Sequence, residues 1–147
     1  MHLSYTRLKR QMHKHLTEKG KLVFSTGDNV LQSDKLLQIP HKQGIYLVYK
    51  DSIKEANLLY VGKSGLVKEN GDFTKQSIFG RLRRNTSDGI SRIVYFQKEV
   101  LKDSGERLVI QWFVTNGTDT LPGTLEAQLL QAYYDRYGNL PPLNKRA

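Results

Sequence analysis

Two short apolar runs, separated by a polar stretch, constrain the fold of this chain most. Residues 44–49 (Gly-Ile-Tyr-Leu-Val-Tyr) and 58–61 (Leu-Leu-Tyr-Val) are rich in the β-branched and aromatic side chains that strands favour. The connection at 50–57 is polar and turn-like, and a glycine closes the second run at Gly62. Two strands joined in this way predict an antiparallel hairpin.

The rest of the chain predicts one more strand and several helices around that hairpin. The helical segments show apolar residues four apart, such as Ile78 and Leu82, and the last helix has a proline in its first turn and Gly138 at its end. Predicted helices cover 77–85, 90–102 and 121–137, a strand covers 108–114, and a loop covers 63–75. Together these elements predict an α+β fold with a small, mainly antiparallel three-stranded sheet flanked by helices.

The first 42 residues have a different character from the remainder. Residues 1–22 predict a basic amphipathic helix, with Leu8, Met12 and Leu16 near one face and Gly20 as its end. Residues 23–42 predict irregular structure. We therefore divide the chain into a basic N-terminal helix and arm, residues 1–42, and a globular domain, residues 43–147.

Charge and composition narrow the functional classes. The chain carries 23 Lys and Arg against 14 Asp and Glu, a net charge of +9, which favours a polyanionic partner such as nucleic acid. It has no cysteine, which excludes disulfide scaffolds and cysteine-ligated metal centres. No apolar run approaches about 18 residues, and no secretory apolar segment follows the basic N-terminus, so we expect a cytoplasmic protein that does not span a membrane.

Five side chains occur along the chain in an order that indicates phosphodiester chemistry. Tyr46 ends a Gly-Ile-Tyr triplet, and Tyr60 begins a Tyr-Val-Gly triplet in the second strand. Arg81 follows in a predicted helix, Glu126 lies in the last predicted helix, and Asn144 ends a Pro-Pro-Leu-Asn sequence in the tail. This pattern resembles the GIY-YIG nuclease family.

The resemblance covers residues 43–144. The Tyr-Val-Gly-Lys-Ser sequence at 60–64 is similar to the form found in the amino-terminal nuclease domain of UvrC. The segment 63–75 resembles an insertion of the kind that some GIY-YIG restriction enzymes have. Some family members carry a histidine one turn after the catalytic arginine, and Asn85 stands at that place here.

The resemblance implies a metal-dependent endonuclease that hydrolyses DNA, and the residue types suit that chemistry. Glu126 is a hard oxygen ligand for Mg²⁺ or Mn²⁺, which one carboxylate, waters and phosphate oxygens commonly hold. Arg81 has the planar fork that clamps a phosphate. Each residue also has a purely structural interpretation when it is considered alone, since helices often carry an arginine or a glutamate on their surface.

The remaining site residues are assigned as the resemblance implies. Tyr46 contacts the attacking water as general base, and Lys63 supplies the positive field that such a role needs, because an ordinary tyrosine has a pKa near 10. Tyr60 hydrogen-bonds the same water or the phosphate. Asn144 holds the tail against the site through side-chain hydrogen bonds.

Further basic residues are candidates for contact with the nucleic-acid backbone. Arg83 and Arg84 follow Arg81 closely, and the sequence leaves open whether Arg81 or Arg83 is the catalytic arginine. The basic N-terminal helix provides a second set, although it could equally be a docking helix with a solvated face. This set comprises Arg7, Lys9, Arg10 and Lys14.

Two other functions remain open from the sequence. The chain could be a non-catalytic nucleic-acid-binding module on the same scaffold, or a nuclease subunit that needs a protein partner. Its size leaves little room for a specificity domain, so a homodimer or a partner protein could supply specificity.

Overall fold

The sheet is antiparallel throughout, and its four strands lie in the order β1-β4-β2-β3. The computed structural model describes residues 2–65, 77–86 and 89–144. The strands are β1 (Lys19–Ser25), β2 (Gly44–Lys50), β3 (Leu58–Ser64) and β4 (Arg107–Val114). The helices are α1 (Tyr5–His15), α2 (Ile78–Arg83), α3 (Arg92–Lys102) and α4 (Pro122–Tyr137), with 3₁₀ turns η1 (Val30–Gln32), η2 (Asp34–Gln38) and η3 (Glu55–Asn57).

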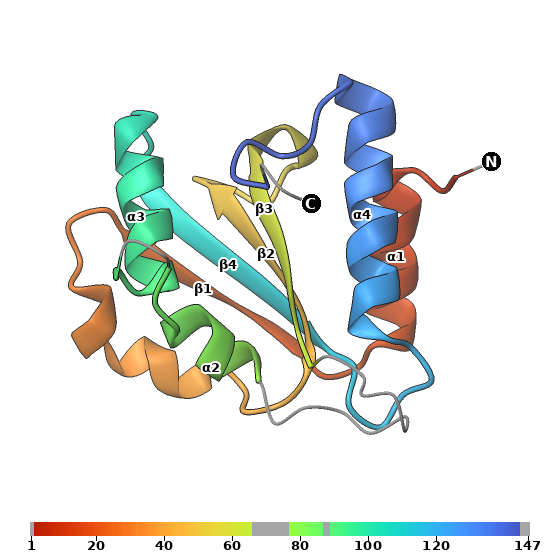
Figure 1. The fold of residues 1–147 in the computed structure, drawn as a ribbon, viewed down its shortest axis with the longest axis horizontal. Coiled ribbons are helices and arrows are strands. Elements are labelled where there is room, and N and C mark those ends of the chain that lie inside the picture. The colour runs from red at the N-terminus through yellow and green to blue at the C-terminus, as the bar shows by residue number, and fades with distance from the viewer. Residues whose placement is uncertain (1, 66–76, 87–88, 145–147) are drawn as a thin grey trace.

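Helices cover both faces of the sheet, so the fold has three layers (Figure 1). Tyr46 and Val48 of β2 belong to the core beneath α2 and α3. Ile45, Leu47 and Tyr49 alternate with them and belong to the core beneath α1 and α4. Because both faces of β2 are buried, this strand is an almost continuous apolar run, as the sequence shows.

The α+β class is confirmed, but the prediction of three strands is wrong. The fourth strand, β1, lies where the sequence predicted the end of the first helix and the start of an irregular arm. The helix ends at His15, and Leu22 and Phe24 then alternate with exposed residues, as in a strand with one buried face. The segment before residue 43 therefore adds a helix and a strand to the same core as the rest of the chain.

The other predicted elements are present with shifted ends. β3 continues to Ser64, so Lys63 belongs to a strand and not to the predicted loop, whose remaining part at 66–75 lies outside the described residues. α2 ends two residues earlier than predicted, and α4 ends as predicted at Gly138, whose φ of 74° suits a glycine. None of the described helices is long and apolar enough to span a membrane.

Lys9 is buried, which corrects the prediction that it contacts a nucleic-acid backbone. Its amine donates a hydrogen bond of 2.9 Å to the Tyr49 hydroxyl and another to the Gln111 side-chain oxygen, and the hydroxyls of Tyr5 and Tyr49 also share a hydrogen bond. Burial lowers the pKa of Lys9 to about 8. The periodicity of α1 could not reveal these partners, because they lie on β2 and β4.

Gly62 is the strand partner of Tyr46, and we expect it to tolerate no side chain. A Cβ at this position would collide with the tyrosine ring, which belongs to the packed core. Gly62→Ala should therefore lower the free energy of unfolding by about 1–3 kcal/mol, as overpacked sites do. Urea denaturation measures this change.

The matched control is Gly27→Ala, because a Cβ there would meet no atom within 4 Å. Its effect should stay within about 1 kcal/mol. Equal denaturation midpoints for the two variants would contradict the close packing of Tyr46 on Gly62.

Candidate active site

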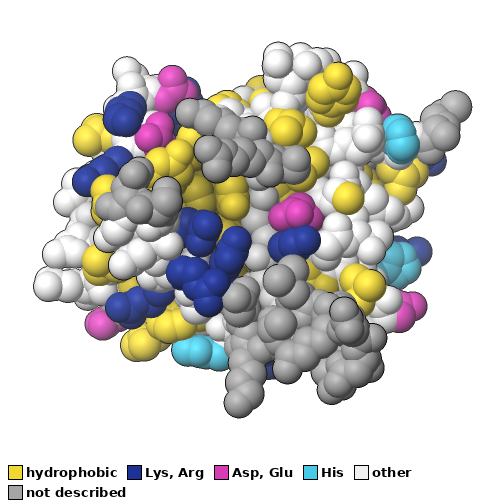
Figure 2. Space-filling model, viewed as in Figure 1, with side chains coloured by type: hydrophobic (Ala, Val, Ile, Leu, Met, Phe, Trp, Pro, Cys, Tyr) yellow, Lys and Arg dark blue, Asp and Glu magenta, His cyan; other side chains and the backbone are white. Residues whose placement is uncertain are grey.

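The predicted catalytic residues gather around one end of the edge strand β3. β2 contributes Tyr46, and β3 contributes Tyr60 and Lys63, whose side chains leave opposite faces of the sheet. α2 contributes Arg81 from one layer, and α4 contributes Glu126 from the other. Figure 2 shows Lys and Arg side chains gathered at the middle of this face of the molecule, beside an acidic side chain. The site therefore straddles the edge of the sheet.

Glu126 is a half-buried carboxylate with cationic neighbours. Its Oε1 lies 3.6 Å from Nζ of Lys63, and its side chain is 25% exposed. Burial raises the pKa of Glu126, while the charges of Lys63 and Arg81 act in the opposite direction. The carboxylate of Glu126 therefore lies near Lys63 of the sheet and near Arg81, which comes from the helical layer on the other face of the sheet.

Tyr46 is fully buried, and its hydroxyl lies close to that of Tyr60, although no hydrogen bond of good geometry joins it to the described residues. Its ring centroid lies 6.0 Å from that of Tyr60. Burial raises the pKa of Tyr46, the Tyr60 hydroxyl raises it further, and the charges of Arg92 and Arg81 lower it. A buried hydroxyl without a partner is uncommon, and this one lies within the electrostatic influence of two guanidinium groups.

Arg81, and not Arg83, faces the site. The short helix α2 is anchored by the buried side chains of Ile78 and Leu82, and the Ser77 hydroxyl caps it by accepting a 3.0 Å hydrogen bond from the backbone of Gly80. Nε of Arg81 is buried without a partner among the described residues.

The charge of Arg81 influences both of the other central groups, Tyr46 and Glu126. Arg83 is exposed instead, and its guanidinium lies over the Phe79 ring at 5.5 Å. The geometry therefore favours Arg81 over Arg83 as the arginine of the candidate site.

Asn144 ties the tail to the edge of β3. Its side-chain oxygen accepts a 2.8 Å hydrogen bond from the backbone N–H of Val61, and its amide donates one of 2.9 Å to the Val61 carbonyl. The backbone N–H of Leu143 also donates to the Leu59 carbonyl at 2.8 Å. Asn144 thus makes the hydrogen bonds that a neighbouring strand would make with Val61, the residue before Gly62.

The basic residues predicted to contact DNA do not form a single surface. Arg83 and Arg84 are exposed at the end of α2. Arg7, Arg10 and Lys14 are exposed on α1, which packs with α4 against the opposite face of the sheet (Figure 1). The predicted backbone contacts therefore belong to two separate faces.

Sequence reasoning missed a second arginine beside Tyr46. Arg92 is the first residue of α3, and its charge lowers the pKa of Tyr46. The side-chain oxygens of Ser91 and Thr86, and Nη1 of Arg92, are buried without a partner among the described residues. The only signal in the sequence was an arginine at the start of a predicted helix, which is too common to single out.

The candidate site offers a metal ion one carboxylate, that of Glu126. Among residues 2–65, 77–86 and 89–144, no three His, Cys, Asp or Glu side chains are placed to hold a metal together. Magnesium is usually held by one or two carboxylates together with waters and substrate phosphates. Glu126, a partly exposed hard ligand, fits that mode, but not a cage built entirely from protein side chains.

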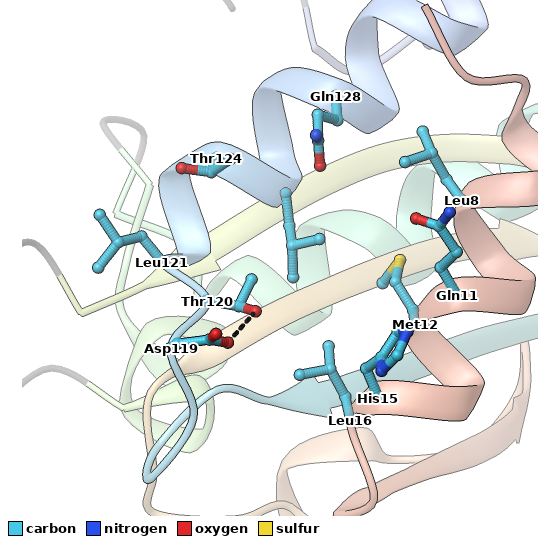
Figure 3. A pocket seen from close by; sticks show the side chains of 11 residues that line it. Leu8, Gln11, Met12, His15, Leu16, Asp119, Thr120, Leu121, Thr124 and Gln128 are labelled. Carbon is cyan, nitrogen blue, oxygen red and sulfur yellow. Dashed lines mark hydrogen bonds between the residues drawn. The ribbon is translucent and has the colours of Figure 1, made fainter.

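A groove of about 660 Å³ lies apart from this constellation, between α1 and α4 (Figure 3). Leu8 and Met12 line it from α1 and Leu16 from just after that helix, while Leu121 and Thr124 line it from the start of α4. None of the predicted catalytic residues lines it, so we do not assign it to the chemistry of the site.

Removing Lys63 should raise the pKa of Glu126 further. The lysine ammonium stabilises the ionised carboxylate, so Lys63→Met leaves the effect of burial less opposed. Carboxyl ¹³C chemical shifts, followed against pH, report this titration. Lys102→Met is the control, because Lys102 pairs with Glu99 on α3, and a titration of Glu126 that is identical in both variants would contradict the pairing.

Comparisons with known proteins identify no relative. No protein-family model, no curated protein and no solved structure matches the chain. The features of the candidate site are a buried tyrosine, two arginines with unpaired nitrogens among the described residues, and a partly buried carboxylate.

Proposed function

We propose that this chain is a metal-dependent endonuclease of the GIY-YIG type, which hydrolyses phosphodiester bonds in DNA. The observation that supports the proposal most strongly is the position of Arg81. Its charge influences both Tyr46 and Glu126, although the three residues come from α2, β2 and α4. An arginine close to both a water-activating group and a metal-binding carboxylate suits phosphodiester hydrolysis.

Hydrolysis of a phosphodiester adds the elements of water across one P–O bond. The water oxygen bonds to phosphorus, its proton is transferred to Oη of Tyr46 in the ionised phenolate form, and the bond to the leaving oxygen breaks; Tyr46 returns the proton to solvent before the next turnover. The leaving oxygen then takes up a proton from solvent. Arg81 stabilises the negative charge that develops on the phosphate oxygens, and Tyr60 orients the water or the phosphate.

Glu126 is the residue that would hold Mg²⁺ or Mn²⁺. When bound, such a cation supplies Lewis-acid stabilisation of the charge on the phosphate and the leaving oxygen. Lys63 contributes a second positive charge beside the carboxylate, at 3.6 Å. Asn144 acts as a positioning residue, because its hydrogen bonds hold the backbone of β3 between Tyr60 and Lys63.

The burial of Tyr46 sets a condition for its role as a base. Desolvation disfavours the phenolate, and only the cationic groups around it favour ionisation. Arg81 and Arg92 provide that compensation from the protein. Positive charge near a buried tyrosine is therefore a functional requirement of this proposal and not merely a source of affinity for DNA.

The net charge of +9 and the exposed Arg83 and Arg84 support DNA as the substrate. Leu82 alone separates Arg83 from Arg81, so a strand whose phosphate is clamped at Arg81 passes close to Arg83 and Arg84. Arg7, Arg10 and Lys14 would engage a strand only if it extends around to α1, or they would serve a second copy of the chain or a partner protein.

Cleavage assays with site variants test the proposal directly. Glu126→Gln and Tyr46→Phe should each lower the rate of DNA cleavage with Mg²⁺ or Mn²⁺ by at least about 100-fold, because one removes the metal ligand and the other the proton acceptor. DNA binding, measured by fluorescence anisotropy in EDTA, should remain. The substrates are duplex, nicked, flapped and branched DNA.

The controls are Glu99→Gln and Tyr134→Phe, which change the same residue types outside the site. Both should cut like the parent protein. If the parent cuts none of these DNAs but still binds them, the nuclease proposal fails and a non-catalytic binding module takes its place.

The rate of cleavage should rise with pH. Because burial raises the pKa of Tyr46 above its ordinary value near 10, the phenolate fraction grows about tenfold per pH unit below that pKa. We expect kcat/KM to follow this slope between pH 7 and 9. A flat profile over this range, with circular dichroism showing a folded protein throughout, would contradict a role for Tyr46 as the base.

A further inference from the structure

In the connection between α2 and α3, residues 84–86 and 90–92 pair with one another and form the two sides of a turn. The backbone N–H of Thr86 donates to the Ile90 carbonyl at 2.7 Å, and the N–H of Arg92 donates to the Arg84 carbonyl at 2.9 Å. Asn85 and Ser91 form an antiparallel bridge between these bonds. The turn therefore holds residues 86, 91 and 92 close to one another.

Three polar side chains on this turn have buried atoms that lack partners. These atoms are Oγ1 of Thr86, Oγ of Ser91 and Nη1 of Arg92, and none has a hydrogen-bond partner among the described residues. Ser91 stands at the N-cap of α3, yet its side chain makes no capping bond. Buried donors of this kind are destabilising unless a ligand or water satisfies them, so their clustering needs an explanation.

The same turn adjoins further unpartnered donors of the candidate active site. The Tyr46 side chain is 0% exposed, and its hydroxyl lacks a partner among the described residues, as does Nε of Arg81. Arg92 and Arg81 both act electrostatically on Tyr46, which places the two guanidinium groups around one hydroxyl. Arg81 and Arg92 therefore both lie near Tyr46, and Arg92 is linked through the backbone of the turn to Thr86 and Ser91.

The Arg92 side of this region is positively charged, whereas Arg81 on its other side has Glu126 as an acidic neighbour. The first turn of α3 contains no acidic residue, so nothing there neutralises the partial positive charge of the helix N-terminus. No ion pair joins Arg92 to a carboxylate within the described ranges 2–65, 77–86 and 89–144. An anion with several acceptor oxygens would satisfy both the charge and the donors.

We propose that Thr86, Ser91 and Arg92 form a second phosphate pocket, which binds a phosphate of the nucleic-acid strand next to the one clamped by Arg81. A phosphodiester offers two unesterified oxygens, each of which accepts more than one hydrogen bond, and it suits a guanidinium flanked by two hydroxyls. This inference rests on the proposed function for the source of the phosphate, but not on cleavage. The pocket sets the path of the strand across Tyr46.

The salt dependence of DNA binding tests the pocket without any cleavage step. The logarithm of the binding constant falls linearly with the logarithm of salt concentration, and each phosphate contact contributes about 0.9 to the slope for duplex DNA. Arg92→Gln should therefore reduce the slope by about 0.9, uniformly across DNA sequences. Fluorescence anisotropy of a labelled duplex, in EDTA at several salt concentrations, measures it.

The matched control is Arg107→Gln. Arg107 is an exposed arginine at the start of β4, far along the strand from Trp112, the partner of Tyr46. Its removal lowers the net charge equally but should leave the slope as in the parent. A slope that falls equally in both variants, or that stays unchanged in Arg92→Gln, overturns the pocket.

A second set of variants guards against misfolding. Arg92→Lys keeps the charge but loses the planar fork, and the double change Thr86→Val with Ser91→Ala keeps both charge and shape. Both should weaken duplex binding at least about threefold at fixed salt, with thermal midpoints close to that of the parent, since each removes hydrogen bonds to a charged group. Binding equal to that of the parent in both variants overturns the pocket.

Inorganic phosphate separates the two sources of this ligand chemistry. Isothermal titration of the parent and of Arg92→Gln with inorganic phosphate shows whether the pocket takes a free ion. If Arg92→Gln loses phosphate binding while its salt slope for DNA is unchanged, the strand assignment is overturned. Failure of the nuclease proposal is distinguishable, because it would appear as absent cleavage with the salt slope still dependent on Arg92.

Discussion

The pairing of Tyr46 with Gly62 is the constraint on which the site depends. The tyrosine ring occupies the space that a side chain at residue 62 would need, so the two strands fit in one register. A slip of one residue would send every side chain of β3 to the other face. In the observed register, Tyr60 lies with Tyr46 on the face of α2 and α3, while Lys63 reaches Glu126 of α4. The fit of Tyr46 on Gly62 thus fixes the register that brings residues of both helical layers together.

The site is built from groups that destabilise the protein as it stands. Tyr46 and Glu126 both have a pKa raised by burial, so the fold disfavours the ionised states that the proposed chemistry uses. Several buried donors around them lack protein partners in the described part of the chain. Strongly shifted pKa values are concentrated at functional sites, because a bound substrate can supply the charges and hydrogen-bond partners that the protein lacks there. The polar cluster of Lys9, Tyr49 and Gln111 differs, since its groups satisfy one another.

The elements with long periodic or apolar sequence patterns were predicted correctly. The strand whose alternating pattern is short was not. The hairpin, β4 and α4 follow from runs of strand formers and from the end signal at Gly138. β1 was missed because only Leu22 and Phe24 alternate there, and because Gly20 was interpreted as a helix end although it accommodates the Trp112 ring. Motif order suggested the residues of the candidate site, but it could not reveal that Arg92 lies near Tyr46, since that proximity arises only when α3 packs on the sheet.

The asparagine that closes the tail has a consequence for solubility as well. β3 is an edge strand, and an edge with unpaired backbone groups is a template on which another chain can add a strand and begin to aggregate. The Asn144 side chain occupies both backbone groups of Val61, and the backbone of residue 143 occupies the Leu59 carbonyl. The opposite edge, β1, carries exposed Lys19 and Lys21, and charge of this kind deters pairing. The residue that holds the tail on β3 thus also covers part of this edge, so its loss would leave the edge free to pair with another chain.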